Sequence, residues 1–464
     1  MAAKRLSFRD PAGCVYASGH RIFRKLSKPY DADVVRFIEG DMFRRCSEAR
    51  VFPATRVVPI EEWPSDIASE GIGAVLEHER IAFPVHAHEW TPGMLFDAGC
   101  LTLDLAEEAL SEGWILKDAT PWNVLFSKGR PIYCDLASFV PLPASALWMA
   151  YAQFQRTFTL PLYAFARHAR SPHSILMENR EGLDPTALLP TVSGWRQWKP
   201  LELALITLPS KLGSAAWAGR VAMRDDNVSE RPVDREKAVF VLRRTFRRLR
   251  KQLNAVRPTT SVTKWGAYED DLSHYSSDDR QIKAAFVQRA VSRRPGMNVL
   301  DIGANAGEYS VIAAENGANV VAVDHDLGAL DRLYKRAKDR QLPISAAVLN
   351  LGRPTPAIGW NNGEVDSFLD RARGNFDLVL ALAVIHHLLV TERVPLDSVL
   401  DLLAGTEAEF LAIEWVSPED GRFRQISSLN HELYRDISED SFRTCVERHY
   451  QVICLLYTSD AADE

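Results

Sequence analysis

The sequence has few cysteines, no long uninterrupted apolar run and no large excess of charge of either sign. Its six cysteines are scattered over 464 residues without a C-x-x-C pair, which argues against a disulfide framework and indicates the reduced thiols of a cytoplasmic protein. The longest apolar run, 376–390, contains Asp377, His386 and His387, so it does not predict a membrane span. A net charge of −6 gives no overall attraction to nucleic acid, and no group of ligand residues predicts a metal site.

The length of the chain predicts two or three domains. Residues 1–230, with many Pro, Trp and Arg between short apolar runs, are expected to form an α+β domain. Residues 231–262 are a basic connector, and 263–453 alternate strand-like and helix-like segments, as a parallel α/β sheet requires. The last residues, 454–464, resemble a translated sequencing adapter, so we treat them as an artefact and expect the C-terminal domain to be truncated at about Ile453.

The basic connector carries nine basic residues and one acid between Arg235 and Arg257. Its apolar residues recur at steps of three and four, which predicts a helix with one apolar stripe: Val239, Leu242, Phe246, Leu249, Leu253 and Val256. We favour a connector helix that packs this stripe on a domain. The alternative is a surface for nucleic acid or anionic lipid.

The clearest motif of the chain begins with Asn298–Ile302, a short apolar strand. Gly303–Gly307 follows as a tight turn, and 308–316 has the pattern of a helix. A second strand, 319–323, ends in Asp324, twenty-one residues after the first glycine. This succession of strand, glycine turn, helix, strand and acid predicts a ligand crevice at the carboxyl edge of a doubly wound sheet.

The residue types of this motif suit a methyl donor better than a dinucleotide. Gly303 and Gly307 let the backbone approach a ligand, and Asn305 tolerates the left-handed conformation. Asp324 can accept hydrogen bonds from both hydroxyls of a ribose. Asp301 would repel a pyrophosphate but suits the ammonium of a methionine moiety, and the third glycine of G-x-G-x-x-G is missing, so an NAD enzyme is disfavoured.

Further strands are expected after this motif. Ile344–Leu349 is the third and is followed by Asn350, Phe376–Ala381 is the fourth, and Phe410–Glu414 is the fifth. Tyr450–Ile453 is expected to begin a sixth. Strands that alternate with helices in this way predict a doubly wound, Rossmann-like α/β sheet.

Together these features resemble motif I and the following strands of the class I S-adenosylmethionine-dependent methyltransferases. The resemblance implies that S-adenosylmethionine is the cofactor and that Asn350, where this family often has Asp, faces its adenine amino group. It also implies a final antiparallel strand between the fifth and the sixth, which would fall in the missing C-terminus, so the sheet should end incomplete, with Leu455 and Leu456 as artificial fillers. The cofactor residues are then Asp301, Gly303, Asn305, Gly307, Asp324, Asn350 and Ala381.

The acceptor side of the site is less well marked. His386 and His387 follow the fourth strand, where methyltransferases often place residues that contact the acceptor, and one of them is our candidate for a catalytic base. The alternative is that both begin a helix, with one buried and one exposed. Glu414 is a weaker candidate, and Lys283 belongs to an upstream group that could cover the methionine end of the cofactor, with Trp265, Tyr268 and Tyr275.

In the N-terminal domain, Asp118 and Asn123 have the D-x-x-x-x-N spacing of a kinase catalytic loop, and Asp135 stands where a second metal-binding Asp would follow. The context departs from kinases, because Lys117 precedes Asp118, Asp135 is not followed by Phe-Gly, and neither a glycine-rich loop nor a nucleotide-binding lysine can be assigned. The domain is therefore read as kinase-like in fold. The alternative is a β-hairpin whose polar residues satisfy turn and loop backbone groups.

As a whole the chain resembles large bacterial methyltransferase-like proteins with an N-terminal extension, among them nodulation (NoeA-like) proteins. The resemblance implies methyl transfer to an unidentified acceptor, which we expect to be a small molecule or a glycan. The rival hypothesis is a regulatory or bifunctional protein with a nucleotide-binding N-terminal domain and a ligand-sensing Rossmann domain. The segments that carry the resemblance are LKDATPWNVLF with YCDLASF, WMAYAQFQRTFTLPL, VLDIGANAGEYS, PTPAIGW, LALAVIHHL and IEWVSPED.

Overall fold

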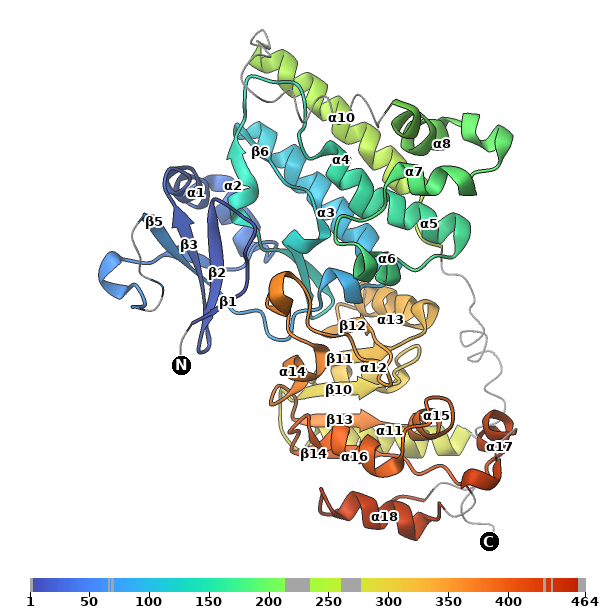
Figure 1. Ribbon diagram of the computed structural model, residues 1–464. Helices are drawn as coiled ribbons and strands as arrows, with labels where there is room; N and C mark the ends of the chain where they lie inside the picture. Colours follow the sequence, from blue (N-terminus) through green and yellow to red (C-terminus); the bar gives the residue numbers. More distant parts are fainter. Residues whose placement is uncertain are drawn as a thin grey trace. The chain divides into compact units, whose positions relative to one another are not determined.

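The computed structural model describes residues 3–65, 67, 71–212, 234–259, 277–428, 431–434 and 437–457. The chain divides into two compact units, residues 1–126 with 131–259, and residues 127–130 with 260–464 (Figure 1). The basic helix therefore belongs to the N-terminal unit and is not a separate connector.

The N-terminal unit begins with an antiparallel sheet in the order β1-β2-β3-β5-β4. Alternate residues of its strands pack on opposite faces, as the two-residue period of a strand requires: Leu26 and Leu76 lie in one core cluster, while Phe23 and Val75 lie in the other. Two helices are inserted between β3 and β4 (Figure 1). These elements are Lys4–Arg5 (β1), Gly13–Ser18 (β2), Arg21–Ser27 (β3), Asp31–Ile38 (α1), Asp41–Glu48 (α2), Thr55–Val57 (β4) and Ile72–His78 (β5).

The long helix α3, Pro92–Ser111, leads from this sheet to a group of short strands. Its start is fixed by Thr91, whose side chain accepts the N–H of Met94, and by a proline in the first turn. In the following strands β6 pairs with β9, and β7 pairs with β8. A strand, a turn and a second strand therefore follow Asn123 directly. The strands are Trp114–Leu116 (β6), Val124–Ser127 (β7), Arg130–Tyr133 (β8) and Phe139–Pro141 (β9).

Helices complete the N-terminal unit, and α10 packs along α3. The helical prediction for the basic segment is confirmed, and its apolar stripe is buried, with Ala238 in the place expected for Val239. Its arginines lie on the remaining faces and are mostly exposed. These helices are Tyr151–Phe154 (α4), Leu160–His168 (α5), Pro172–Glu178 (α6), Pro185–Leu188 (α7), Pro200–Glu202 (α8) and Arg235–Ala255 (α10).

The C-terminal unit is built on a parallel sheet in the order β12-β11-β10-β13-β14, which confirms the doubly wound, Rossmann-like prediction (Figure 1). Its strands are Asn298–Ile302 (β10), Asn319–Asp324 (β11), Ile344–Val348 (β12), Leu378–Ala381 (β13) and Phe410–Ile413 (β14). Its helices are Ser277–Val291 (α11), Glu308–Glu315 (α12), Leu327–Asp339 (α13), Phe368–Ala372 (α14), Ile385–Val390 (α15), Leu396–Ala404 (α16), Gly421–Ser427 (α17) and Glu439–Glu447 (α18).

The prediction of a sixth strand at Tyr450–Ile453 is wrong, because residues 451–457 form no strand. In the strand order implied by the methyltransferase resemblance, the sixth strand pairs only with the final antiparallel strand. Without that neighbour its backbone has no ladder to join. Leu455 and Leu456 do not fill the gap either, since they are 50% and 39% exposed.

Candidate active site

The glycine turn joins β10 to α12 and is held against β11 by backbone hydrogen bonds. Gly303 and Ala304 both donate their N–H to the carbonyl oxygen of Val323, at 2.9 and 3.1 Å. Gly303, Asn305 and Gly307 have φ values of +71°, +49° and +78°. Asn305 therefore adopts the left-handed conformation expected for it, which costs Asn less than most residues.

The two glycines are required by protein contacts as well as by their backbone angles. A Cβ on Gly303 would lie 2.9 Å from Cγ2 of Val384, and one on Gly307 would collide with Leu333 of α13. The sequence suggested that these positions keep room for a ligand. In the structure the missing Cβ of each faces a neighbouring side chain, so glycine allows the turn to pack closely against the rest of the unit.

Asp301, near the end of β10, lies beneath the turn and is 3% exposed. Its Oδ2 accepts the hydroxyl of Ser310 on α12 at 2.5 Å. Burial raises the pKa of Asp301 to about 7, while the hydrogen bond from Ser310 opposes this rise. The carboxyl thus ties the first strand to the first helix, and its interaction with the ammonium of the cofactor stays a prediction.

Asp324 ends β11 beside the turn, and its side chain is 11% exposed. Its Oδ2 accepts the backbone N–H of Asn305 at 2.9 Å, and its Oδ1 accepts that of Asp326 at the same distance. These bonds orient the carboxylate at the carboxyl end of the strand. The orientation is compatible with the predicted role of accepting ribose hydroxyls, because a carboxylate oxygen can accept more than one hydrogen bond.

Asn350 follows β12, and both ends of its side chain are bonded within the protein. Its Nδ2 donates to Oε1 of Glu392 at 2.8 Å, and its Oδ1 accepts the backbone N–H of Gly352 at 2.8 Å. Arg353 lies 3.5 Å from the same Oε1. The hydrogen bond from Asn350, followed by the charge of Arg353, lowers the pKa of Glu392. The acceptor oxygen that we assigned to adenine is therefore shared with the backbone of the loop.

Glu414, which follows β14, is linked both to α11 and to the loop after β13. Lys283 of α11 donates to Oε1 of Glu414 at 2.6 Å, and Oε2 of Glu414 accepts the backbone N–H of Ala383 at 2.9 Å. Ala383 has a φ of +51°, unusual for alanine, just after Ala381 at the end of β13. Separate roles were predicted for Lys283 and Glu414. In the structure they act together to hold the loop that leads to the two histidines.

His386 and His387 begin the short helix α15, directly after that loop. Their ring centroids are 4.3 Å apart. His386 is 6% exposed and lies 6.4 Å from the ring of Phe423, while His387 is half-buried. The structure thus agrees with the alternative of one buried and one accessible histidine at a helix start, and His387 becomes the better placed of the two to reach an acceptor.

Trp265, Tyr268 and Tyr275, predicted to cover the cofactor, lie outside the described residues. Within the described parts of the chain, no helix is both long and apolar enough to cross a bilayer. The same residues contain no group of three or more His, Cys, Asp or Glu arranged to hold a metal ion.

The residues at the carboxyl edge of the C-terminal sheet fit S-adenosylmethionine. Two backbone N–H groups orient the carboxylate of Asp324, and the left-handed turn at Gly303 and Asn305 brings backbone groups to the same edge. Ligands of doubly wound sheets bind at this edge, where the strand order reverses between the first strand and its neighbours, here β10 and β13.

Comparison with known proteins agrees with this geometry. Residues 275–451 match a family model described as a methyltransferase domain. With the parallel sheet and the glycine turn, this match identifies the C-terminal unit as a methyltransferase domain whose cofactor is S-adenosylmethionine. The chain is also similar to the nodulation protein NoeA of Rhizobium meliloti (strain 1021), with 27% identity over 453 residues, 96% of this chain and 92% of that protein.

Solved structures show more distant similarity. A crystal structure of WbdD has 20% identity and a TM-score of 0.28, and the match covers 40% of this chain and 38% of that one. An S-adenosylmethionine-dependent methyltransferase from Agrobacterium tumefaciens has 20% identity and a TM-score of 0.18, over 22% of this chain and 31% of that one. The present chain thus spans about two fifths or less of these proteins, and TM-scores of this size do not establish a common overall fold.

In the N-terminal unit, the structure brings Asp118, Asn123 and Asp135 into one network of polar side chains. Asn123 Nδ2 donates to Ser138 Oγ at 3.2 Å, and that hydroxyl in turn donates to Asp135. The network also includes Arg24 of β3, whose NH1 lies 2.8 Å from Oδ1 of Asp135. Arg24 could not be predicted from the sequence. Its signal was weak, because one arginine in a mixed strand stands far from the other residues along the chain.

Proposed function

We propose that this chain transfers a methyl group from S-adenosylmethionine to a small molecule or glycan. One observation carries the proposal. The same edge of the sheet holds the glycine turn with Asp324 beside it and, after β13, the pair of histidines on α15. Methyl transfer needs this combination, because a donor must be aligned with an acceptor whose proton is then removed.

When bound, S-adenosylmethionine supplies an activated methyl group on a sulfonium. Asp324 and the backbone of the Gly303 turn hold the nucleoside end. His387, half-buried at the start of α15, takes the proton of the acceptor, and the buried His386 keeps its neighbour in place through ring contact. The ion pair of Lys283 with Glu414 fixes the loop before these histidines through the N–H of Ala383.

The charges at this edge favour an acceptor that is not a polyanion. This edge has three carboxylates and two permanent cations: Asp324, Glu392 and Glu414 on one side of the balance, and Lys283 and Arg353 on the other. Nucleic acid binding depends on a surplus of Lys and Arg that neutralises phosphates. The carboxylates therefore suit a neutral, hydroxyl-bearing small molecule or glycan better than a nucleic acid.

A screen with radiolabelled S-adenosylmethionine tests this proposal. Small molecules, glycans and nucleic acid are offered as acceptors to the full chain and to the variants His387→Ala and His386→Ala. We expect label only in a small molecule or glycan, and a loss of about 100-fold or more in kcat for His387→Ala with unchanged cofactor affinity. Transfer chiefly to nucleic acid would contradict the acceptor class, and full activity of both variants would exclude the histidines as bases.

A further inference from the structure

The N-terminal unit exposes several large apolar side chains just before and just after α8, which lies at one side of the unit (Figure 1). Trp195 and Trp198 are 68% and 66% exposed, and Leu208 and Leu212 are 44% and 64% exposed. Single exposed apolar residues are common on proteins, but a contiguous group of them marks a site for another protein or a membrane. Methyl transfer gives this group no role.

The two tryptophans lie on a short helix, Gly194–Trp198, that is anchored from the inside of the unit. The hydroxyl of Thr207 donates to the carbonyl oxygen of Gln197 at 2.9 Å, and Nε2 of Gln197 donates to the carbonyl oxygen of Val192 at 3.0 Å. Thr207 and Val192 are both buried. The backbone of the short helix is therefore fixed, while the two indoles remain in solvent.

Two lysines join the tryptophans and the leucines into one surface. Lys199 Nζ lies 4.6 Å from the ring centroid of Trp195, and Lys211 Nζ lies 5.0 Å from that of Trp198. The second contact brings the segment after α8 beside the segment before it. Residues 208–212 are helical, so Leu208 and Leu212, one turn apart, lie on the same face as Lys211. We call this surface the aromatic-basic patch: Trp195, Trp198, Lys199, Leu208, Lys211 and Leu212.

The charge of the aromatic-basic patch is positive. Arg196, between the two tryptophans in the chain, is exposed like the two lysines. The segment 191–212 contains one acid, Glu202, which is 5% exposed and lies 3.4 Å from the hydroxyl of Tyr163. The cations of this segment are therefore not balanced by an exposed carboxylate of the same segment, and the patch is complementary to an anionic surface.

The combination of indole, leucine and lysine is the one found at the boundary between lipid and water. Indole rings collect at the level of the lipid headgroups, and lysines cover apolar surface with their stems while the ammonium stays in water. Single-stranded nucleic acid also uses aromatic residues and cations, but its bases stack on open ring faces. Here each indole already has a lysine over one face, and the two leucines add aliphatic surface that base stacking does not need.

We propose that the N-terminal unit docks on an anionic lipid bilayer through the aromatic-basic patch. Trp195 and Trp198 enter the headgroup layer together with the leucines, while Lys199 and Lys211 pair with lipid phosphates. The association is peripheral and reversible, because only a few side chains enter the lipid and none of the helices in the described residues could span a bilayer. Docking does not depend on the methyltransferase proposal.

Co-sedimentation of the full chain with lipid vesicles tests the proposal. One set of vesicles contains phosphatidylcholine alone, and the other contains equal parts of phosphatidylcholine and phosphatidylserine. We expect binding to the second set, weakened by added salt, and little binding to the first. No binding to either set at millimolar lipid, or equal binding to both, would overturn the proposal. Binding to a single-stranded oligonucleotide that phosphatidylserine vesicles do not compete away would overturn it as well.

Replacement of the exposed tryptophans tests the apolar part of the contact. The double variant Trp195→Ser with Trp198→Ser should bind phosphatidylserine vesicles at least about tenfold more weakly, since two indoles no longer enter the interface. Trp360→Ser is the control, because Trp360 belongs to the C-terminal unit and is 64% exposed. Equal losses of binding in the two proteins, both folded by circular dichroism, would contradict the role of the patch.

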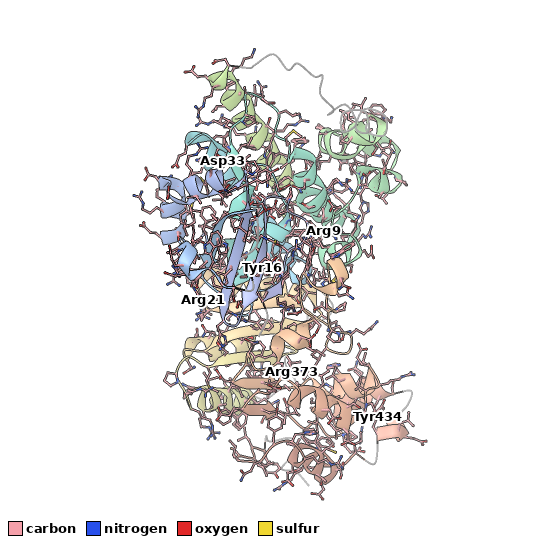
Figure 2. All side chains as sticks on the ribbon, turned by 60° about the vertical axis from the view of Figure 1, so that its left-hand side comes forward. Arg9, Tyr16, Arg21, Asp33, Arg373 and Tyr434 are labelled. Carbon is pink, nitrogen blue, oxygen red and sulfur yellow. The ribbon has the colours of Figure 1, made fainter. Side chains whose placement is uncertain are left out.

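Replacement of single cations tests the basic part, even if the tryptophan variant fails to fold. Lys199→Gln should weaken binding several-fold. Arg21→Gln removes the same charge from the same unit and should have little effect, because Arg21 (labelled in Figure 2) is paired with both carboxylate oxygens of Glu77. Equal effects of these two substitutions would contradict a specific contact at the patch.

The basic helix α10 provides a stricter comparison, since its exposed arginines form a second positive surface of the N-terminal unit. The double variant Lys199→Gln with Lys211→Gln is compared with Arg243→Gln combined with Arg247→Gln, which removes the same charge from α10. We expect the larger loss of vesicle binding in the lysine variant. A larger loss in the arginine variant would place the membrane contact on α10 and overturn the proposal.

Discussion

The two units of this chain build their polar sites in opposite ways. The C-terminal site is made largely of backbone, because the turn at Gly303 is held by main-chain hydrogen bonds and Asp324 by main-chain donors. The N-terminal network is made of side-chain charges, with Arg24, Asp10 and Asp135 brought together from distant segments. A backbone site depends on conformation and close packing, whereas a charge site depends on each partner being present. The two should therefore fail under different substitutions.

The largest effect is expected where the backbone site is most constrained. Gly307→Ala places a side chain at a φ of +78° and against Leu333, and should destabilise the C-terminal unit by about 3 kcal/mol, from strain and overpacking together. Gly296→Ala is the control, since its φ is +73° but no atom lies within 4 Å of the added Cβ, so only about 1 kcal/mol is expected. Chemical denaturation measures both, and equal losses would show that packing against α13 contributes nothing.

A smaller effect is expected from the buried carboxyl of Asp301, beneath the glycine turn. Burial raises the pKa of Asp301 to about 7, so the folded unit holds this proton more tightly than the unfolded chain. Stability should therefore fall as pH rises from about 4, the unfolded value, to about 7, and level off above it. Asp301→Asn should remove this dependence and stabilise the unit at pH 8 by about 2 kcal/mol. An unchanged pH profile in the variant would contradict the assignment.

In the N-terminal network, loss of one hydroxyl should have a measurable cost. Ser138 is fully buried and links the amide of Asn123 to the carboxylate of Asp135. Ser138→Ala should destabilise this unit by about 1–2 kcal/mol, because two partly buried polar groups, the Asn123 amide and the Asp135 carboxylate, lose a partner. The exposed Ser111, which bonds only the carbonyl of Glu108, is the control, and Ser111→Ala should cost much less. Urea unfolding distinguishes them, and a neutral Ser138→Ala would show that the network is not cooperative.

The smallest expected effect concerns the ion pair at the edge of the C-terminal sheet. A double-mutant cycle with Lys283→Met and Glu414→Gln should give a coupling energy of about 1 kcal/mol, because both side chains are largely buried, at 11% and 18% exposure. The exposed pair Arg443 and Glu447 should give about 0.3 kcal/mol. Coupling energies of equal size would show that the burial of the first pair is unimportant.

The contrast between the sites also explains what could be predicted from the sequence. The turn from Gly303 to Gly307 and the acid Asp324 are close in the chain, so their order and spacing predict a strand-turn-helix-strand and its crevice. The reason for the glycines could not be predicted, because Val384 and Leu333 come from other elements. The prediction of a sixth strand failed for a similar reason, since none of the strands in the described residues lies beside Tyr450–Ile453 to pair with it.

In the N-terminal unit, only residues that lie close together in the sequence motif could be predicted. Asp118, Asn123 and Asp135 follow a recognisable spacing, and a β-hairpin was one of the two interpretations of this segment. Arg24 could not be found, because it lies on β3, far along the chain from Asp135, and only the tertiary fold brings the two together. Its role follows from tertiary contacts, which no local pattern encodes.

The central claim is that the C-terminal unit binds S-adenosylmethionine at the edge marked by Asp324. Mass spectrometry of the small molecules that co-purify with the full chain, followed by calorimetry with S-adenosylmethionine, tests it directly. We expect S-adenosylmethionine or its demethylated product in the wild-type protein, and affinity reduced by about tenfold or more in Asp324→Ala, which loses charge-assisted hydrogen bonds to the ribose. Co-purified NADH, or wild-type affinity in Asp324→Ala, would contradict the claim.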